Sequence, residues 1–202
     1  MSAACNSKPL TGLEDLVAEI RACRACAEAL PHAPNPVIWV HPKARILIAG
    51  QAPGRLVHET NIPWNDRSGD RLRTWMGLDR EAFYTRENIA VAAMGFCFPG
   101  TARGSDLPPS KQCAPLWRPR LLPLLKEVRL TLLVGRYAHQ YHLGGEAKAT
   151  LTETVAAWRA YPSSMVALPH PSWRNCGWLK RNLWFETELL PVLRQRVREA
   201  LS

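Results

Sequence analysis

Four short apolar runs constrain the fold of this chain more than any other feature, at residues 44–49, 89–94, 130–134 and 165–168. Continuous apolar runs of this length indicate strands that are buried on both faces of a sheet. Segments that favour helices lie between the runs, at residues 68–75, 112–125, 136–142 and 152–160. The alternation predicts an α/β fold, a three-layer α/β/α sandwich around a four-stranded, mainly parallel central sheet.

The remaining segments surround this core. A helix is expected from about Gly12 into the first cysteines, and two more helices are expected over residues 178–190 and 192–201. The four prolines between residues 27 and 43 exclude a long helix and predict an ordered, extended crossing. A chain of 202 residues is expected to form one domain, over residues 11–202, after a flexible tail at residues 1–10.

Composition narrows the class of protein. No apolar run approaches the roughly 18 residues of a membrane span. The first residues do not resemble a signal peptide, so we expect a cytoplasmic protein without a membrane partner, and a monomer. The net charge is +9, from 26 Lys and Arg against 17 Asp and Glu. This excess favours contact with nucleic-acid phosphates, although a solvated basic surface is the plainer alternative.

Two of the strand-like runs lead into loops that carry polar side chains. The first run is followed by Gly50-Gln51-Ala52-Pro53-Gly54, and the last run leads into His170-Pro171-Ser172-Trp173-Arg174-Asn175. In open α/β sheets, ligands bind beyond the carboxyl ends of the strands. The two loops are therefore expected to converge on one pocket, although each loop alone is also compatible with an ordinary turn.

The chain has six cysteines, which are not expected to form disulfides in the cytoplasm. Cys23 and Cys26 form a C-x-x-C pair, and Cys97 and Cys113 form a second pair on either side of a Pro-rich loop. Four thiolates that meet in space suit either zinc or an iron–sulfur cluster. Buried free cysteines that act as small hydrophobic residues are the alternative.

These motifs follow one another in the order of a known family. From about Cys23 to about Leu190, the chain resembles the uracil-DNA glycosylase superfamily, and especially its iron–sulfur branch from bacteria and archaea. The matching stretches are the C-x-x-C pair, the 50–54 loop, residues 63–72, the segment from Cys97 to Cys113, and the 170–175 loop. Where the family's first loop carries an acid, this chain has Gln51, which predicts a shifted substrate range or a weak activity.

The resemblance implies a monofunctional DNA glycosylase of base excision repair, which hydrolyses the N-glycosidic bond of uracil or a related deaminated base. Its partner would be DNA that contains the damaged base. The resemblance also implies a [4Fe–4S] cluster on Cys23, Cys26, Cys97 and Cys113, with zinc as the alternative. A non-catalytic nucleic-acid-binding relative of the same fold is a second interpretation. A small-molecule enzyme that holds a phosphate on the 50–54 loop is a third.

The chemistry of this reaction suggests roles for three residues. Breaking an N-glycosidic bond leaves negative charge on the departing base, and His170 is expected to donate a hydrogen bond to a carbonyl oxygen of that base. Gln51 can position the attacking water but cannot deprotonate it, because an amide does not titrate. Asp66 is a titratable candidate for helping the water, as is His58, although Asp66 is also placed to cap the helix that follows it.

The other expected contacts fall into two groups. The flipped base is expected to stack on an aromatic ring and to have its edges read by amides and by the first loop, through Trp64, Asn65, Asn175, Ala52 and Pro53. The DNA backbone is expected to contact Pro171, Ser172 and Arg174.

Overall fold

The central sheet has four strands in the order β2-β1-β5-β6, and all three pairings between them are parallel. They are β1 (Ile46–Ala49), β2 (Ile89–Val91), β5 (Leu130–Val134) and β6 (Met165–Leu168). This computed structural model describes residues 12–202, so the tail expected at residues 1–10 lies outside the described residues. The sheet confirms the expected α/β fold, and each strand lies within the apolar run that predicts it.

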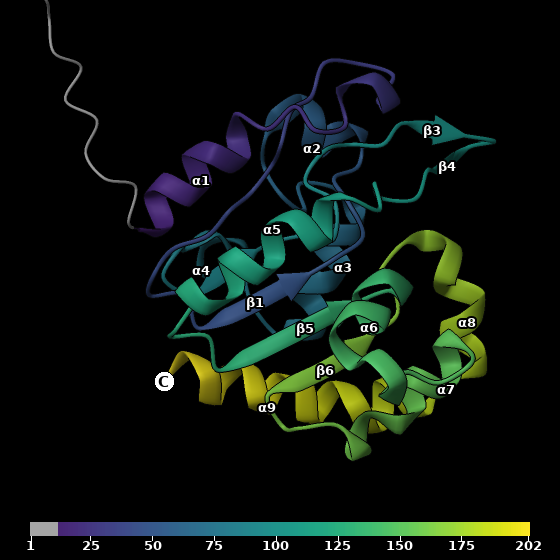
Figure 1. The fold of residues 1–202 in the computed structure, drawn as a ribbon. Coiled ribbons are helices and arrows are strands. Elements are labelled where there is room, and N and C mark those ends of the chain that lie inside the picture. The colour runs from purple at the N-terminus through teal and green to yellow at the C-terminus, as the bar shows by residue number, and fades with distance from the viewer. Residues whose placement is uncertain (1–11) are drawn as a thin grey trace, which may run out of the picture.

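Helices cover both faces of the sheet (Figure 1). The α-helices are α1 (Leu13–Arg21), α2 (Arg55–Thr60), α3 (Arg67–Met76), α4 (Arg80–Tyr84), α5 (Cys113–Leu121), α6 (Arg136–Leu143), α7 (Leu151–Ala156), α8 (Cys176–Arg181) and α9 (Leu190–Leu201). Shorter 3-10 turns are η1 (Ala27–Ala29), η2 (Leu122–Leu124), η3 (Gly144–Glu146), η4 (Ala157–Ala160) and η5 (Trp173–Asn175). The segment η6 (Phe185–Leu189) is a π-helix that continues directly into α9.

Alternate residues of each strand enter different halves of the core, as a two-residue period requires. Ile46 and Ile48 of β1 belong to the cluster that includes residues of α3 and α9. Leu47, between them, belongs to the cluster of α1 and α5. Because both faces of the sheet are buried in this way, the strand sequences are continuous apolar runs and do not alternate between apolar and polar residues.

The Pro-rich segment at residues 27–43 crosses the molecule in extended form, as predicted, with only the short turn η1 at its start. Trp39 forms an antiparallel bridge with Val91, in which the Trp39 N–H donates to the Val91 carbonyl at 3.1 Å. The Val37 N–H donates to the carbonyl of Phe96 at 2.7 Å. The crossing therefore covers the free edge of β2, which would otherwise offer unpaired backbone groups.

The prediction of one helix over residues 178–190 is wrong. The helix α8 ends at Arg181, and a new helical segment begins at Phe185 and runs through α9. No break occurs at Pro191, where the π-helix η6 passes directly into α9. Sequence reasoning also missed α2, α4 and a small hairpin of β3 (Thr101–Ala102) and β4 (Ser105–Asp106).

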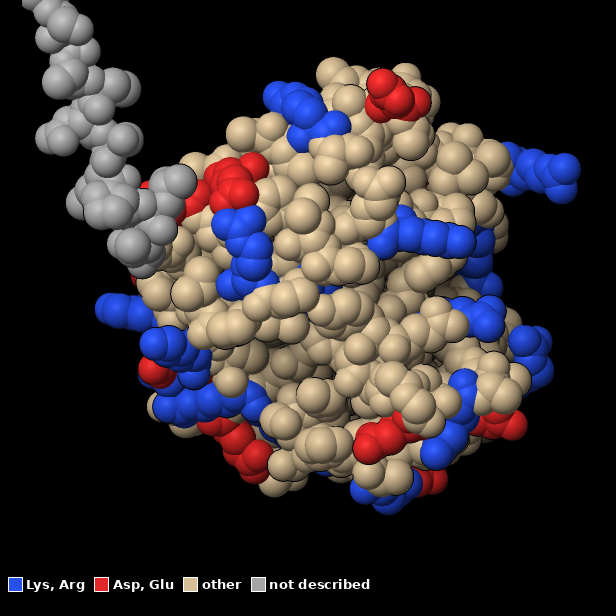
Figure 2. Space-filling model, viewed as in Figure 1, with Lys and Arg blue, Asp and Glu red and all other residues tan. Residues whose placement is uncertain are grey.

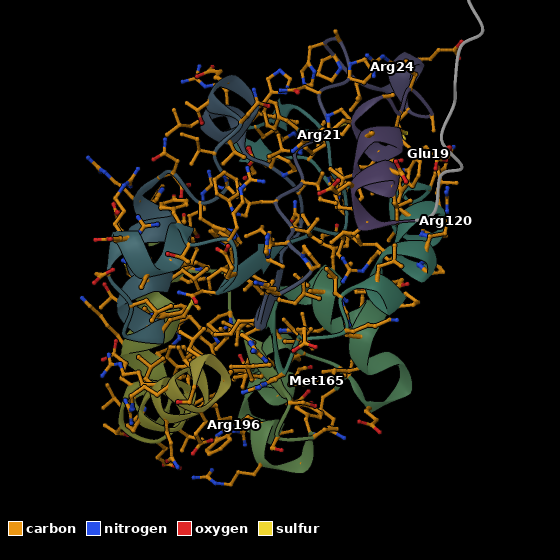
Figure 3. All side chains as sticks on the ribbon, turned by 90° about the vertical axis from the view of Figure 1, so that its left-hand side faces the viewer. Glu19, Arg21, Arg24, Arg120, Met165 and Arg196 are labelled. Atoms are coloured by element: carbon orange, nitrogen blue, oxygen red, sulfur yellow. The ribbon has the colours of Figure 1, made fainter. Side chains whose placement is uncertain are left out.

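Contacts between surface side chains add little to the packing of these helices. Figure 3 shows Glu19 of α1 beside Arg120 of α5, whose guanidinium donates to Glu19 Oε1 at 2.7 Å. Exposed pairs of this kind typically contribute little to stability, because solvent screens the two charges. The buried contacts of Leu16 and Ile20 with the α5 side therefore hold α1 in place. None of the helices within residues 12–202 is long and apolar enough to cross a membrane.

Within the described part of the chain, one charged side chain is fully buried. Arg118 of α5 is 0% exposed and donates to the carbonyl of Ala92 at 2.8 Å. Its Nη2 lies 2.5 Å from Nε2 of His142. Burial, and then the positive charge of Arg118, lower the pKa of His142 to about 4. A protonated His142 would place two positive charges side by side in the interior, so the folded protein keeps this imidazole neutral.

We expect this pair to reduce stability in acid. Between pH 6.5 and about 4, the unfolded chain binds a proton on His142 that the folded protein does not bind, so the free energy of unfolding decreases as the pH falls. Urea unfolding at a series of pH values measures the decrease. His142→Gln should show a shallower decrease than the parent protein, and identical pH dependence in the two proteins would contradict this role of His142.

Candidate active site

A cavity of about 510 Å³ opens at the carboxyl edge of the sheet. The loop after β1 (residues 50–54), Ala93 after β2 and His170 after β6 all line it, together with the start of α3. Small-molecule sites typically occupy about 300–1,000 Å³. β2 and β5 pair with opposite edges of β1, so the strand order changes direction at β1. In open α/β sheets, a change of this kind places a ligand crevice beyond the strand ends.

The loop after β1 is tied to the loop after β2. The carbonyls of Gly50 and Gln51 accept hydrogen bonds from the N–H groups of Met94 and Gly95, at 2.8 and 2.9 Å. The Gln51 side-chain amide donates to the carbonyl of Leu107 at 2.9 Å. This wall of the cavity is therefore held by backbone bonds, and the NH2 group of Gln51 is already engaged with the segment after the hairpin.

Trp64 presents its ring to the cavity from a strained backbone. Its φ is 57°, in the left-handed region that non-glycine residues seldom occupy. A side chain at Gly69 would place its Cβ only 1.7 Å from the Trp64 carbonyl oxygen, so this position must be glycine. The buried guanidinium of Arg73 donates to the same carbonyl at 3.2 Å. Backbone strain that is held in this way is typical of functional sites.

His170 lies beside Trp64 on the wall of the cavity, with ring centres 5.6 Å apart. Burial lowers the pKa of His170, and the negative charge of Asp66 opposes this only in part. The imidazole is therefore neutral at neutral pH and carries one N–H group. The loop that bears it is held in place, because Asn175 donates to the His170 carbonyl at 2.6 Å and Arg71 donates to the Ser172 carbonyl at 2.9 Å.

Most of the residues that the sequence assigns to the pocket line this one cavity: Gln51, Ala52, Pro53, Trp64, Asp66, His170, Ser172 and Arg174. Three others do not line it. The amide oxygen of Asn65 accepts a hydrogen bond from Arg80 at 2.9 Å, and the amide of Asn175 holds the His170 carbonyl, so both amides stabilise the protein itself. Pro171 is buried and presents no surface to a DNA backbone.

Asp66 caps α3, as the sequence suggests. Its Oδ1 accepts a hydrogen bond from the N–H of Gly69 at 2.8 Å, and the residue lies on the wall of the cavity. The carboxylate also acts electrostatically on His170 and on Asp106. Asp66 thus combines a structural bond with a negative charge inside the site. The other titratable candidate, His58, packs against His32 and Phe98 and is absent from the cavity lining.

The comparison with known families agrees with this geometry. The sequence matches the model of the uracil DNA glycosylase superfamily over residues 38–194, a segment that contains all four central strands and both loops of the cavity. The chain belongs to the uracil DNA glycosylase superfamily. The match begins after Cys23 and Cys26, so it bears on the cavity and not on the first cysteine pair.

Sequence reasoning missed two features of this glycosylase-superfamily site. Trp173 is 72% exposed and lies on the rim of the cavity. Its position inside the second loop, among polar neighbours, is the signal that could have found it. Ser105 and Asp106 of the hairpin also line the cavity. The dipeptide Arg103-Gly104, with φ of 49° and 73°, forms the tight turn of that hairpin and is a recognisable turn signal.

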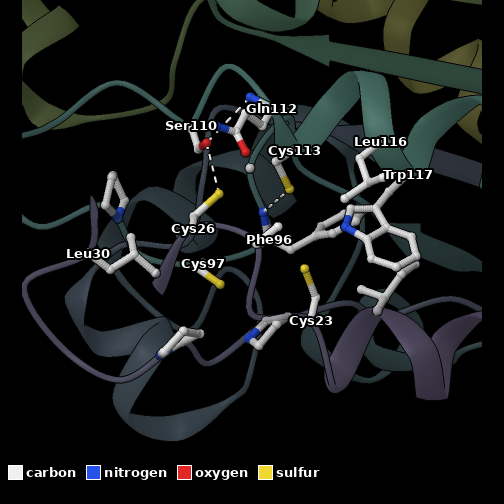
Figure 4. Close-up of a pocket in the computed structure, with 16 residues that line it drawn as sticks. Cys23, Cys26, Leu30, Phe96, Cys97, Ser110, Gln112, Cys113, Leu116 and Trp117 are labelled. Carbon is white, nitrogen blue, oxygen red and sulfur yellow. Dashed lines mark hydrogen bonds between the residues drawn. The ribbon is translucent and has the colours of Figure 1, made fainter. Parts of the chain in front are cut away.

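The four cysteines predicted to bind a metal surround a second, much smaller cavity of about 30 Å³. Figure 4 shows Cys23, Cys26, Cys97 and Cys113 around this space. Burial raises the pKa of the Cys97 thiol to about 11 and that of the Cys113 thiol to about 12. The five cysteines that the structure describes are all free thiols.

The donor set of this cavity fits an iron–sulfur cluster in its chemistry. Four cysteines are the usual ligands of such a cluster, and the Phe96 N–H, which donates to Cys113 Sγ at 3.3 Å, can stabilise a thiolate. The raised pKa values require a bound metal to deprotonate these thiols. Within residues 12–202, no three His, Cys, Asp or Glu side chains are arranged as ligands of one metal ion.

Substitutions of Asp66 can separate its structural role as the cap of α3 from the effect of its negative charge. Asp66→Ala should reduce the free energy of unfolding by about 1 kcal/mol, because the Gly69 N–H loses its acceptor, whereas Asp66→Asn should cost much less, since Asn also caps helices well. Urea unfolding measures both. Asp79 caps α4 in the same way, through Ala82 at 2.7 Å, and the same pair of substitutions there is the control. Equal losses in Asp66→Asn and Asp66→Ala would contradict the capping role.

Proposed function

We propose that this protein is a monofunctional DNA glycosylase that excises uracil or a related deaminated base by attack of water, acting as a cytoplasmic monomer. The observation that supports this most is the neutral, half-buried imidazole of His170, which lies beside Trp64 in a cavity at the carboxyl edge of the sheet. Membership of the uracil DNA glycosylase superfamily supports the same reaction class.

The proposed reaction uses the neutral imidazole as a donor. As the bond between the base and the sugar breaks, its electron pair leaves with the base, and negative charge collects on a carbonyl oxygen. The N–H of His170 stabilises that oxygen, as donors in oxyanion holes do. A charged imidazolium would be costly to keep in this half-buried position, which fits the lowered pKa. Backbone N–H groups near Gln51 and Ala52 are the proposed donors to the other oxygen.

The target base must leave the DNA stack before it can enter the cavity. Trp64 offers a ring on which the base can stack, and Trp173, exposed on the rim, is placed to contact the neighbouring bases. Figure 2 shows Lys and Arg side chains along the right-hand side of this view, where the hairpin and α8 lie in Figure 1. We propose that this side follows the DNA phosphates.

Two observations bear on the reaction type. None of the described residues that line the cavity is a lysine, so no amine is placed to form a Schiff base with the sugar. Water attack therefore suits the site better. A non-catalytic DNA-binding protein is the second candidate function, favoured by Gln51, which replaces a titratable group and whose NH2 is bound to Leu107.

Single-turnover assays on oligonucleotides test the function directly. DNA with uracil, hypoxanthine or xanthine is incubated with the protein and treated with alkali, which cleaves abasic sites. We expect excision of at least one deaminated base by the wild type. His170→Ala should lower that rate by about a hundredfold to a thousandfold. Its affinity for undamaged DNA should hardly change, because phosphate contacts supply most of that affinity.

His41→Ala is the matched control, because this histidine does not line the cavity and should leave the rate unchanged. Tight, salt-dependent DNA binding without any abasic product would support the non-catalytic candidate instead. A His170→Ala variant as active as the wild type would show that the reaction does not use this cavity.

We further propose that Cys23, Cys26, Cys97 and Cys113 hold a [4Fe–4S] cluster, which would join the Pro-rich crossing to the segment that carries the hairpin. The cavity that all four thiols line supports this. Thiolate-bound iron gives the protein a brown colour and broad visible absorbance. Cys97→Ser should lose both, together with about four iron atoms per chain measured by metal analysis. Cys176→Ser is the control, because Cys176 is exposed and outside this cavity. Colourless protein with one equivalent of zinc would refute iron and leave the four ligands.

A further inference from the structure

The hairpin β3–β4 adds a carboxylate to the candidate active site. It lies in the segment between Cys97 and Cys113, and Figure 1 shows it standing away from the central sheet. Ser105 and Asp106, its second strand, line the same cavity as Gln51 and His170. The hairpin therefore forms a wall of the cavity that is independent of the parallel sheet.

Both loops of the cavity hold this hairpin in place. From the second loop, Arg174 donates to Ser105 Oγ at 3.0 Å and to the carbonyl of Gly104. From the first loop, Gln51 donates to the carbonyl of Leu107 at 2.9 Å. Asp106 lies between these two attachments, so its position is determined from both sides of the cavity.

The Asp106 carboxyl lies next to Gly54, where a side chain would contact it. A Cβ built on Gly54 would lie 3.5 Å from Asp106 Oδ2. Because Gly54 has no side chain, nothing from that position separates the carboxyl from the cavity. No hydrogen bond to this carboxyl comes from the described residues, and only the charges of Arg174 and Asp66 act on it.

A carboxylate with unused acceptor capacity discriminates between ligand edges. It accepts hydrogen bonds from N–H and O–H groups, and it repels a carbonyl oxygen or a ring nitrogen lone pair. Ala52 and Ala93, which also line the cavity, have no polar side chain that could discriminate between ligands in this way. Asp106 belongs to an exposed strand at the rim of the cavity, and the partial burial of its carboxyl raises the pKa, an effect that Arg174 opposes and Asp66 reinforces.

We propose that Asp106 determines which base the site accepts, by requiring an N–H or O–H group on the base edge that faces Gly54. This inference rests on the proposed glycosylase function and assigns part of its specificity. Sites that are built to hydrogen-bond a donor reject analogues without it far more strongly than apolar pockets reject a missing methylene group. The hairpin would then act in substrate selection, separately from the donor His170.

The test compares rates on a panel of bases under single-turnover conditions. The panel contains uracil and cytosine, thymine and 5-hydroxymethyluracil, and hypoxanthine and xanthine, each pair differing in the donors it presents. We expect Asp106→Leu to change the wild-type ratio between members of at least one pair by tenfold or more, of the order that a lost polar contact gives. The base with the additional donor should lose rate, while its partner keeps or gains rate.

Two further variants separate specificity from folding. Gly54→Ala places a methyl group beside Asp106 at ordinary contact distance, on a backbone that alanine can adopt, with φ of −81°. Gly54→Ala should change the rate ratio between the same two bases, in the same direction as Asp106→Leu. Asp79→Asn changes a carboxylate that does not line the cavity and should leave every rate unchanged. Thermal unfolding of each variant checks that the fold is retained.

The outcomes separate this inference from the proposed function. An Asp106→Leu variant that slows all the wild-type substrates by one common factor, or by none, overturns the specificity role and leaves the glycosylase function standing. A wild type that excises no base in the panel overturns the proposed function, and the specificity role with it. A changed ratio in both Asp106→Leu and Gly54→Ala supports the inference.

Discussion

Parallel pairing of β1 with both β2 and β5 is the constraint on which the cavity depends. Ile48 of β1 lies opposite Val91 on one side and Leu132 on the other, so the three strands end close to one level. The carboxyl end of each strand then delivers its loop to the same edge of the sheet. Through the pairing of β5 with β6, this edge also receives His170, more than a hundred residues after Gln51.

The site is held more rigidly than loops usually are. Trp64 keeps a left-handed backbone conformation that costs of order 1–3 kcal/mol. The contact with Gly69 and the hydrogen bond from Arg73 offset this cost by fixing the Trp64 carbonyl. A stacking ring that is already oriented loses little entropy when a base docks against it, which suits a site that must capture a nucleotide displaced from a helix.

The hairpin connects the two cavities of the protein. The segment between Cys97 and Cys113 begins and ends at the small cysteine-lined cavity, and its middle part reaches the large one. Anything that orders the cysteines therefore also limits the positions open to Asp106. The proposed metal centre would hold both ends of the segment whose middle forms the proposed specificity wall, so loss of the metal would loosen the wall.

The sequence alone determined the sheet, most of its covering helices and the pairing of the two loops, because continuous apolar runs and glycine or proline breaks are local signals that survive in any context. The tertiary structure decided what local signals cannot carry. Asn65 and Asn175, predicted as amides that read the base, do not line the cavity and make hydrogen bonds to Arg80 and the His170 carbonyl. Asp106 carries no motif, and it reaches the cavity because Arg174 and Gln51 hold the hairpin against loops distant in the chain. Which side chains face a common space depends on long-range packing, and that is the part of the site that only the folded protein specifies.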